Sequence, residues 1–159
     1  MRTDQEIRET IARDQSELIE RELNKIENAN TLAVLASEPI NAYSTSGHKR
    51  KEKYHRMARK QLHKLAQQLD LDPGDYEIRS NKGGVAVCGE ITLHTDTLYV
   101  QVSQSCLGPG HELMMRGCDG RKDYGGKLHG RYANRWGTAA DMDDPRRVYD
   151  MLEAAGLLA

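Results

Sequence analysis

Apolar residues recur at helical spacing in the first part of the chain. Between residue 4 and about residue 36, no Gly or Pro interrupts a series of Ile, Leu and Ala positions. Polar residues such as Gln15 and Glu22 break this stripe, so the helix predicted within residues 1–36 buries little surface by itself. We therefore expect residues 1–36 to dock on the rest of the chain or to mediate homo-oligomerisation.

A second helix is predicted after a linker of small polar residues. The linker, residues 37–48, is rich in turn formers. In residues 49–71, apolar positions recur three and four residues apart, at Tyr54, Ala58, Leu62, Leu65 and Leu69. The sequence Asp72-Pro73-Gly74 is expected to end this helix.

From Asp75 onward the apolar period changes to two, which predicts strands. Three strands are expected, around residues 76–78, 85–93 and 98–102, and residues 112–117 are a candidate fourth. The intervening segments 81–84 and 94–96 are short enough for hairpin turns. Residues 75–117 are therefore predicted to form an antiparallel meander.

The rest of the chain is predicted as a loop and a short helix. Residues 118–142 are basic, aromatic and rich in glycine, without apolar periodicity. The C-terminal helix, 143–157, is expected to have Asp143 or Asp144 as its N-cap and Pro145 in its first turn. The predicted fold is α+β, with a long N-terminal helix, a second basic helix and a C-terminal helix on a three- to four-stranded antiparallel meander.

Composition narrows the class of protein. A chain of 159 residues, 38% hydrophobic and 30% charged, suits one domain, and its net charge of −1 gives no overall attraction to polyanions. The chain has no run of ~18 apolar residues, and its N-terminus is charged from the second residue, so we expect neither a membrane span nor a signal peptide. Three cysteines at irregular spacing suit a reducing compartment, so a cytoplasmic location is expected.

The strongest local charge lies on the second helix. Eight Lys or Arg residues between positions 49 and 64 face a single acid, Glu52. Four of them are spaced three, four and four residues apart and share one face: Lys53, Arg56, Lys60 and Lys64. This face could contact nucleic-acid phosphates, or it could simply be solvated. Three histidines, 48, 55 and 63, are expected to belong to the same helix surface.

A second cationic set lies in the glycine-rich segment, interleaved with aromatic residues. We predict that Arg121, Lys122, Tyr124 and Lys127 clamp or read a nucleic-acid strand. The alternative is that the aromatics Tyr132 and Trp136 anchor the loop to the core. If this set and the basic helix face form one continuous stripe, the hypothesis of nucleic-acid binding gains support. If they lie on opposite sides of the molecule, the hypothesis is weakened.

A third candidate site is the polar face of the predicted sheet. Alternation places five polar residues where they could floor a cleft under the glycine-rich loop: Glu90, Tyr99, Gln101, Ser103 and Arg116. The alternative is a face that meets water, as one side of an antiparallel sheet usually does. Such a cleft could belong to an enzyme acting on a nucleotide or phosphoester.

Specific catalytic patterns do not emerge. A metal-dependent nuclease would use Glu90 and Asp96, but residues 99–103 lack the carboxylate and lysine that such a strand carries. A zinc site from Cys106, His111, Cys118 and His129 has unsuitable spacing. We therefore expect no cofactor and no metal, and assign no catalytic residue.

The stretch from Lys53 to Trp136 contains the motifs SNKGG at 80–84, YVQVSQS at 99–105 and GRKDYGG at 120–126. In these motifs it resembles small uncharacterised proteins of phages and prophages. The resemblance implies a mobile genetic element as the setting, and no activity.

Three hypotheses follow for function. The first is a non-enzymatic nucleic-acid-binding accessory protein, with DNA or RNA as the partner and weak sequence specificity. The second is a protein-interaction or inhibitor module acting on a host protein. The third is the nucleotide- or phosphoester-directed enzyme.

Overall fold

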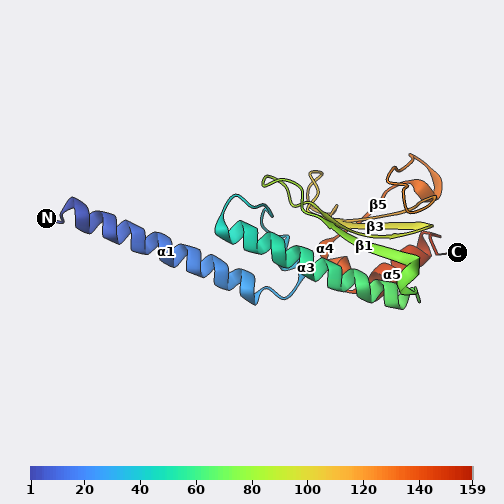
Figure 1. Ribbon diagram of the computed structural model, residues 1–159, viewed down its shortest axis with the longest axis horizontal. Coiled ribbons are helices and arrows are strands. Elements are labelled where there is room, and N and C mark those ends of the chain that lie inside the picture. Colours follow the sequence, from blue (N-terminus) through green and yellow to red (C-terminus); the bar gives the residue numbers. More distant parts are fainter. Residues whose placement is uncertain (159) are drawn as a thin grey trace.

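The computed structural model of the protein describes residues 1–158 and confirms the α+β class (Figure 1). The helices are α1 (Asp4–Asn28), α2 (Leu32–Leu35), α3 (Thr45–Gln68), α4 (Ala139–Met142) and α5 (Pro145–Ala154), with 3₁₀ turns η1 (Pro73–Asp75) and η2 (Gly130–Tyr132). The strands are β1 (Tyr76–Asn81), β2 (Glu90–Thr95), β3 (Leu98–Ser103), β4 (Leu113–Gly117) and β5 (Arg135–Gly137).

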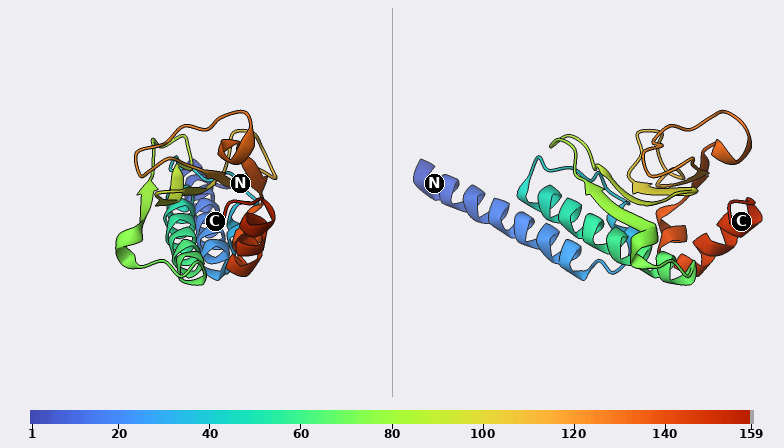
Figure 2. Two further views of the ribbon diagram at one scale, coloured as in Figure 1. Left: turned by 90° about the vertical axis from the view of Figure 1, so that its right-hand side faces the viewer. Right: turned by 45° about the vertical axis from the view of Figure 1, so that its right-hand side comes forward.

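The five strands form one antiparallel sheet in the order β1-β2-β3-β4-β5. Its apolar face packs against α3 and α5, while the segment between β4 and β5, residues 118–134, passes over the opposite face (Figure 2). Alternation along the strands assigns the two faces, because successive side chains point to opposite sides. In β2, for example, Ile91 and Leu93 are fully buried in the core cluster.

Helix α3 forms where the apolar stripe predicts it, but it begins earlier. The Ser44 hydroxyl accepts a hydrogen bond from the Gly47 amide (3.0 Å), so the helix starts at Thr45 instead of residue 49. Tyr54, Ala58, Leu62 and Leu65 are buried, which confirms the stripe. The Tyr54 hydroxyl also donates to the carbonyl of Ser103 (3.1 Å), tying α3 to the sheet.

The prediction of one helix up to residue 36 is wrong, because α1 ends at Asn28 and a separate short helix, α2, follows. The carboxylate of Asp143 accepts hydrogen bonds from the amides of Leu32 (2.7 Å) and Ala33 (3.0 Å). These amides are free only at a helix N-terminus, so a residue more than a hundred positions away stabilises the break.

The strand expected from Val85 is also wrong, because residues 82–89 form a loop and β2 begins at Glu90. Val85 and Val87 are exposed by 58% and 51%. Gly89 has a φ of 75°, and a Cβ there would lie 2.1 Å from the carbonyl oxygen of Asn81. Glycine therefore permits the close return of the chain into β2.

The count of three to four strands is too low, because β5 lies inside the segment predicted as a loop over 118–142. β5 has three residues and pairs with β4 from Gly137 to Arg135. Such a short strand shows no detectable alternation, and pairing with β4 defines it. Helix α4 falls in the same segment. The C-terminal helix α5 has Asp144 as its N-cap and Pro145 in its first turn, as predicted, but it ends at Ala154 instead of residue 157.

Candidate functional site

The polar face of the sheet carries a grid of hydrogen-bonding side chains. Strand register brings Thr92 beside Arg79 on one neighbour and beside Gln101 on the other. In the next row, Tyr99 lies between His94 and Arg116. The middle of this face is therefore polar and aromatic from β1 to β4.

Arg116 of β4 holds the loop 118–134 over this face. Only 5% of the residue is exposed, and its guanidinium lies 4.3 Å from the centre of the Tyr99 ring. Its Nη2 donates to the Tyr124 carbonyl (2.6 Å) and its Nη1 to Asn134 Oδ1 (3.1 Å). A buried guanidinium requires such partners, and the loop supplies one from its backbone and one from a side chain, while Arg116 Nε is buried without a hydrogen-bond partner within residues 1–158.

Arg79 of β1 holds the same loop from the other side. Its Nη1 donates to the Tyr124 hydroxyl (2.7 Å), and its Nη2 lies 3.1 Å from His94 Nδ1. His94 Nε2 donates to the carbonyl of Gly120 (2.9 Å). Because a carbonyl only accepts, the Nε2 atom carries the proton and Nδ1 accepts from Arg79.

His94 is consequently held in its neutral form. Burial lowers its pKa, and the nearby positive charges of Arg79 and Arg121 lower it further, against the opposing effect of the hydrogen bond to Gly120. Protonation of Nδ1 would place a second donor against the Arg79 guanidinium. The neutral imidazole is thus part of the structure that seats the loop.

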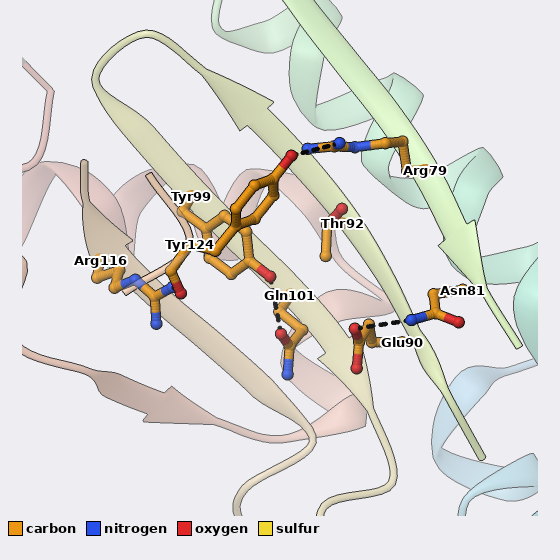
Figure 3. Close-up of a pocket in the computed structure, with 8 residues that line it drawn as sticks. All are labelled: Arg79, Asn81, Glu90, Thr92, Tyr99, Gln101, Arg116 and Tyr124. Carbon is orange, nitrogen blue, oxygen red and sulfur yellow. Dashed lines mark hydrogen bonds between the residues drawn. The ribbon is translucent and has the colours of Figure 1, made fainter. Parts of the chain in front are cut away.

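Between the sheet and Tyr124 lies a cavity of about 480 Å³ (Figure 3). Its walls come from β1 to β4 and the loop: Arg79, Asn81, Glu90, Thr92, Tyr99, Gln101, Arg116 and Tyr124. The volume lies within the range of ligand pockets, roughly 300–1,000 Å³. Arg79 and Arg116 lie on opposite sides of Tyr124, and Glu90 lies beside Asn81, away from Tyr124 (Figure 3).

Several polar groups of this cavity keep unused hydrogen-bonding capacity. The Tyr99 hydroxyl donates to Gln101 Oε1 (3.0 Å), and Asn81 Nδ2 donates to Glu90 Oε1 (3.4 Å). Within residues 1–158, the Gln101 amide nitrogen, the Thr92 hydroxyl and the second oxygen of Glu90 have no hydrogen-bond partner. The cavity therefore offers donors and an acceptor to a ligand.

Four of the five residues predicted for a cleft meet in this cavity: Glu90, Tyr99, Gln101 and Arg116. Ser103 lies on the same face but does not line the cavity. Sequence reasoning missed Arg79 and Asn81. Their alternation with Tyr76 and Ile78 on the first predicted strand was a usable signal for them.

The basic face of α3 lies elsewhere. Lys53 is half-buried, and its Nζ donates to the carbonyls of Ile26 and Glu27 (both 2.7 Å) at the end of α1. Arg56, Lys60 and Lys64 are exposed. One of the four predicted phosphate contacts is thus used within the protein.

The predicted loop residues also differ in their roles. Arg121 forms ion pairs with Glu77 (3.6 Å) and Asp96 (3.3 Å). Tyr124 roofs the cavity, and Lys127 lies 4.6 Å from the centre of the Tyr132 ring. Lys122 is exposed.

The two cationic sets lie on opposite sides of the sheet, because α3 packs under one face and the loop covers the other (Figures 1 and 2). They do not form one stripe. The hypothesis that both sets bind the same nucleic-acid strand therefore loses support, and nucleic-acid binding by either set stays a prediction.

Histidine and cysteine positions add no second centre. His55, expected on the surface of the basic helix, is instead buried, with its Nε2 donating to the carbonyl of Cys88 (2.8 Å). Burial raises the pKa of Cys88 to about 11, which makes it a poor nucleophile. Among residues 1–158, no three His, Cys, Asp or Glu side chains are grouped to hold a metal, and no helix is long and apolar enough to cross a membrane.

Comparison with known proteins gives no family for this chain. No protein-family model matches it, and neither a curated protein nor a solved structure matches it. The cavity itself is therefore the basis for a functional proposal.

Proposed function

We propose that the protein binds a nucleotide, or another organic phosphoester, in the cavity between the polar sheet face and Tyr124. The observation that carries the proposal is a cavity of about 480 Å³ in which Thr92, Gln101 and Glu90 have polar atoms without a protein partner, with arginines on both sides of Tyr124. Unpaired polar groups gathered in one concave site are typical of a ligand pocket.

Arg79, beside the Tyr124 hydroxyl, suits a phosphate. A guanidinium has five N–H donors, and Arg79 directs three of its groups toward Tyr124, His94 and Glu77. The remaining N–H groups, together with the Tyr124 hydroxyl hydrogen, are available to phosphate oxygens. Arginine is well suited to such contacts because its donors form a rigid fork.

Glu90 and Gln101 suit the edge of a nucleobase. The free oxygen of Glu90 accepts a hydrogen bond, and the Gln101 amide donates one. Neighbouring acceptor and donor groups match the adjacent N–H and C=O or ring nitrogen of a base edge. Tyr124, 55% exposed, supplies an aromatic surface for stacking.

The same chemistry would admit one unpaired nucleotide of a single-stranded nucleic acid. Such binding would use the cavity and not the exposed cations of α3. Turnover of a bound phosphoester would make the protein an enzyme, which the binding experiment can detect in parallel.

Isothermal titration calorimetry with nucleoside monophosphates, their nucleosides and inorganic phosphate tests the proposal. We expect a nucleotide to bind, and Arg79→Met to weaken it by about tenfold or more while changing nucleoside affinity little, because a charge-assisted contact contributes roughly 1.5–3 kcal/mol. Gln101→Leu should weaken nucleotide and nucleoside alike. Lys122→Met, on the same loop but outside the cavity, is the matched control.

Phosphorus NMR of the same mixtures reports any hydrolysis. Absence of heat and of chemical-shift change with every nucleotide at millimolar concentration would overturn the proposal. Binding that survives both Arg79→Met and Gln101→Leu would place the ligand elsewhere on the protein.

A further inference from the structure

Helix α1 extends away from the body of the protein as a free arm (Figure 1). Its only buried residue is Ile26, near its C-terminal end. Four large apolar side chains further toward the N-terminus are 43 to 58% exposed: Ile7, Ile11, Leu18 and Ile19. A helix without tertiary contacts is marginal in water, so this arm requires a surface to pack on.

The free part of the arm is acidic. Residues 4–21 contain six Asp or Glu and three Arg, a net charge of −3. None of these six carboxylates forms an ion pair within residues 1–158. Asp14 and Glu17 are exposed next to Leu18. A partner for the arm should therefore be basic.

The exposed face of α3 is a basic surface of matching length. Lys49, Arg56, Lys60 and Lys64 are exposed along it, and none of them pairs with an acid within the described residues. At 1.5 Å per residue, the span from 49 to 64 is roughly 23 Å and the free arm is roughly 27 Å. The same face already receives the end of α1, through Lys53 and the carbonyls of Ile26 and Glu27.

Helix directions make the two surfaces self-complementary between copies. α1 and α3 run the same way, with α1 displaced beyond the N-terminal end of α3, in both Figure 1 and the right view of Figure 2. A two-fold axis near the junction of the helices would lay each arm antiparallel along α3 of the other copy. Both contacts are then equivalent, as a closed dimer requires.

We propose that the protein forms a two-fold dimer in which the acidic arm of each copy covers the basic face of α3 in the other. The aliphatic stems of Arg56, Lys60 and Lys64 would cover the exposed Ile and Leu side chains of the arm, while their charged ends meet its carboxylates. This proposal is independent of the nucleotide cavity, which lies on the opposite side of the sheet.

A charge exchange between copies tests the dimer. In the variant Lys60→Glu/Lys64→Glu the altered part of α3 is acidic and faces an acidic arm, and in Asp14→Lys/Glu17→Lys the altered part of the arm is basic and faces a basic α3. Each variant alone should sediment as a monomer. An equimolar mixture should dimerise again, because each arm then meets an α3 face of opposite charge.

Sedimentation velocity gives the readout for these samples. We expect each variant to raise the dimer dissociation constant by about tenfold or more, and association of the wild type to weaken between about 50 and 500 mM salt. Hydrogen exchange should show protection of residues 4–21 in the wild type and in the mixture, and rapid exchange in the separate variants.

A control matched to Lys60→Glu/Lys64→Glu makes the same change in net charge on other surfaces of the protein. Lys82→Glu/Lys122→Glu should dimerise like the wild type, and circular dichroism checks the folding of every variant. A wild-type protein that stays monomeric at high concentration and low salt overturns the proposal. An equimolar mixture of the two variants that remains monomeric also overturns it. Binding of DNA or RNA to the α3 face without competition from the arm would do the same.

Discussion

The two faces of the sheet are built from the same five strands and are covered by different means. On one face, Ile91, Leu93, Val100 and Val102 pack against helices and are fully buried. On the other, the loop 118–134 is held through hydrogen bonds and aromatic contacts of arginines. The first face is closed by apolar area, and the second by directional contacts that a ligand could share or replace.

The two faces should therefore contribute differently to the global stability of the protein and to local opening. Apolar burial contributes in proportion to area and tolerates no water, so the helix-covered face should set the free energy of unfolding. The loop-covered face contains a cavity, and its cover depends on a few groups around Arg79 and Arg116. Local opening of the loop should therefore cost much less than global unfolding.

The largest effect is expected on the helix-covered face. Leu93→Ala should lower the free energy of unfolding by about 2–5 kcal/mol, because it removes buried methyl groups and leaves a void. Urea denaturation followed by circular dichroism measures the change. Val87→Ala, at an exposed position in the loop 82–89, should stay within about 0.5 kcal/mol. Equal losses in both variants would contradict the assignment of Leu93 to the core.

On the loop-covered face, Arg116→Met should lower the free energy of unfolding by about 2–3 kcal/mol, because charge-assisted hydrogen bonds to Tyr124 and Asn134 are lost. Hydrogen exchange should accelerate in residues 118–134 before it does in the strands. Lys122→Met, exposed on the same loop, is the control and should leave exchange unchanged. Uniform acceleration over the whole sheet would show that the loop is not a separate unit.

Acid provides a smaller and graded test that involves both faces. The pKa values of His55 and His94 are lowered in the folded protein, chiefly by burial. Below the unfolded pKa of about 6.5 the unfolded chain binds more protons, so stability is complete above that pH and declines as the pH falls. The slope is at most about 1.4 kcal/mol per pH unit for each histidine.

Urea midpoints at several pH values between 5 and 8 measure this decline. His94→Gln should reduce the loss of stability at low pH and should prevent acid from accelerating hydrogen exchange in the loop 118–134. Of the two histidines, only His94 contacts Arg79 and Gly120. His55→Gln should reduce the loss of stability at low pH without changing hydrogen exchange in the loop 118–134. A pH profile that neither substitution alters would show that other groups control the acid sensitivity.

Helices and strands were predictable from the sequence where the periodic pattern of apolar residues was long and regular. The stripe of α3 and the strands β1, β3 and β4 were predictable, as was β2 from Glu90 onward, because burial on one face leaves a periodic trace. Alternation also brought Glu90, Tyr99, Gln101 and Arg116 to one side of the sheet. The break after α1 was not predictable, because the helix-capping carboxylate of Asp143 comes from the far end of the chain.

The charges of α3 show the limit most clearly. As a sequence, residues 49–64 are a uniform row of cations, yet Arg50 and Lys51 are buried. Arg50 donates to the carbonyl of Leu35 (3.0 Å), and Lys51 donates to that of Gly84 (2.9 Å). The first acceptor is the last residue of α2 and the second lies in the loop 82–89, and both positions depend on the whole fold.

The sequence by itself determined the α+β class, the apolar side of α3 and the polar side of the sheet, because each follows from local periodicity. Only the tertiary structure decided that the loop 118–134 closes a cavity, that Arg79 belongs to it, and that the cations of α3 and of the loop lie apart. The physical reason is that hydrogen-bond partners and charge neighbours are set by contacts between distant segments, which leave no periodic trace in the chain.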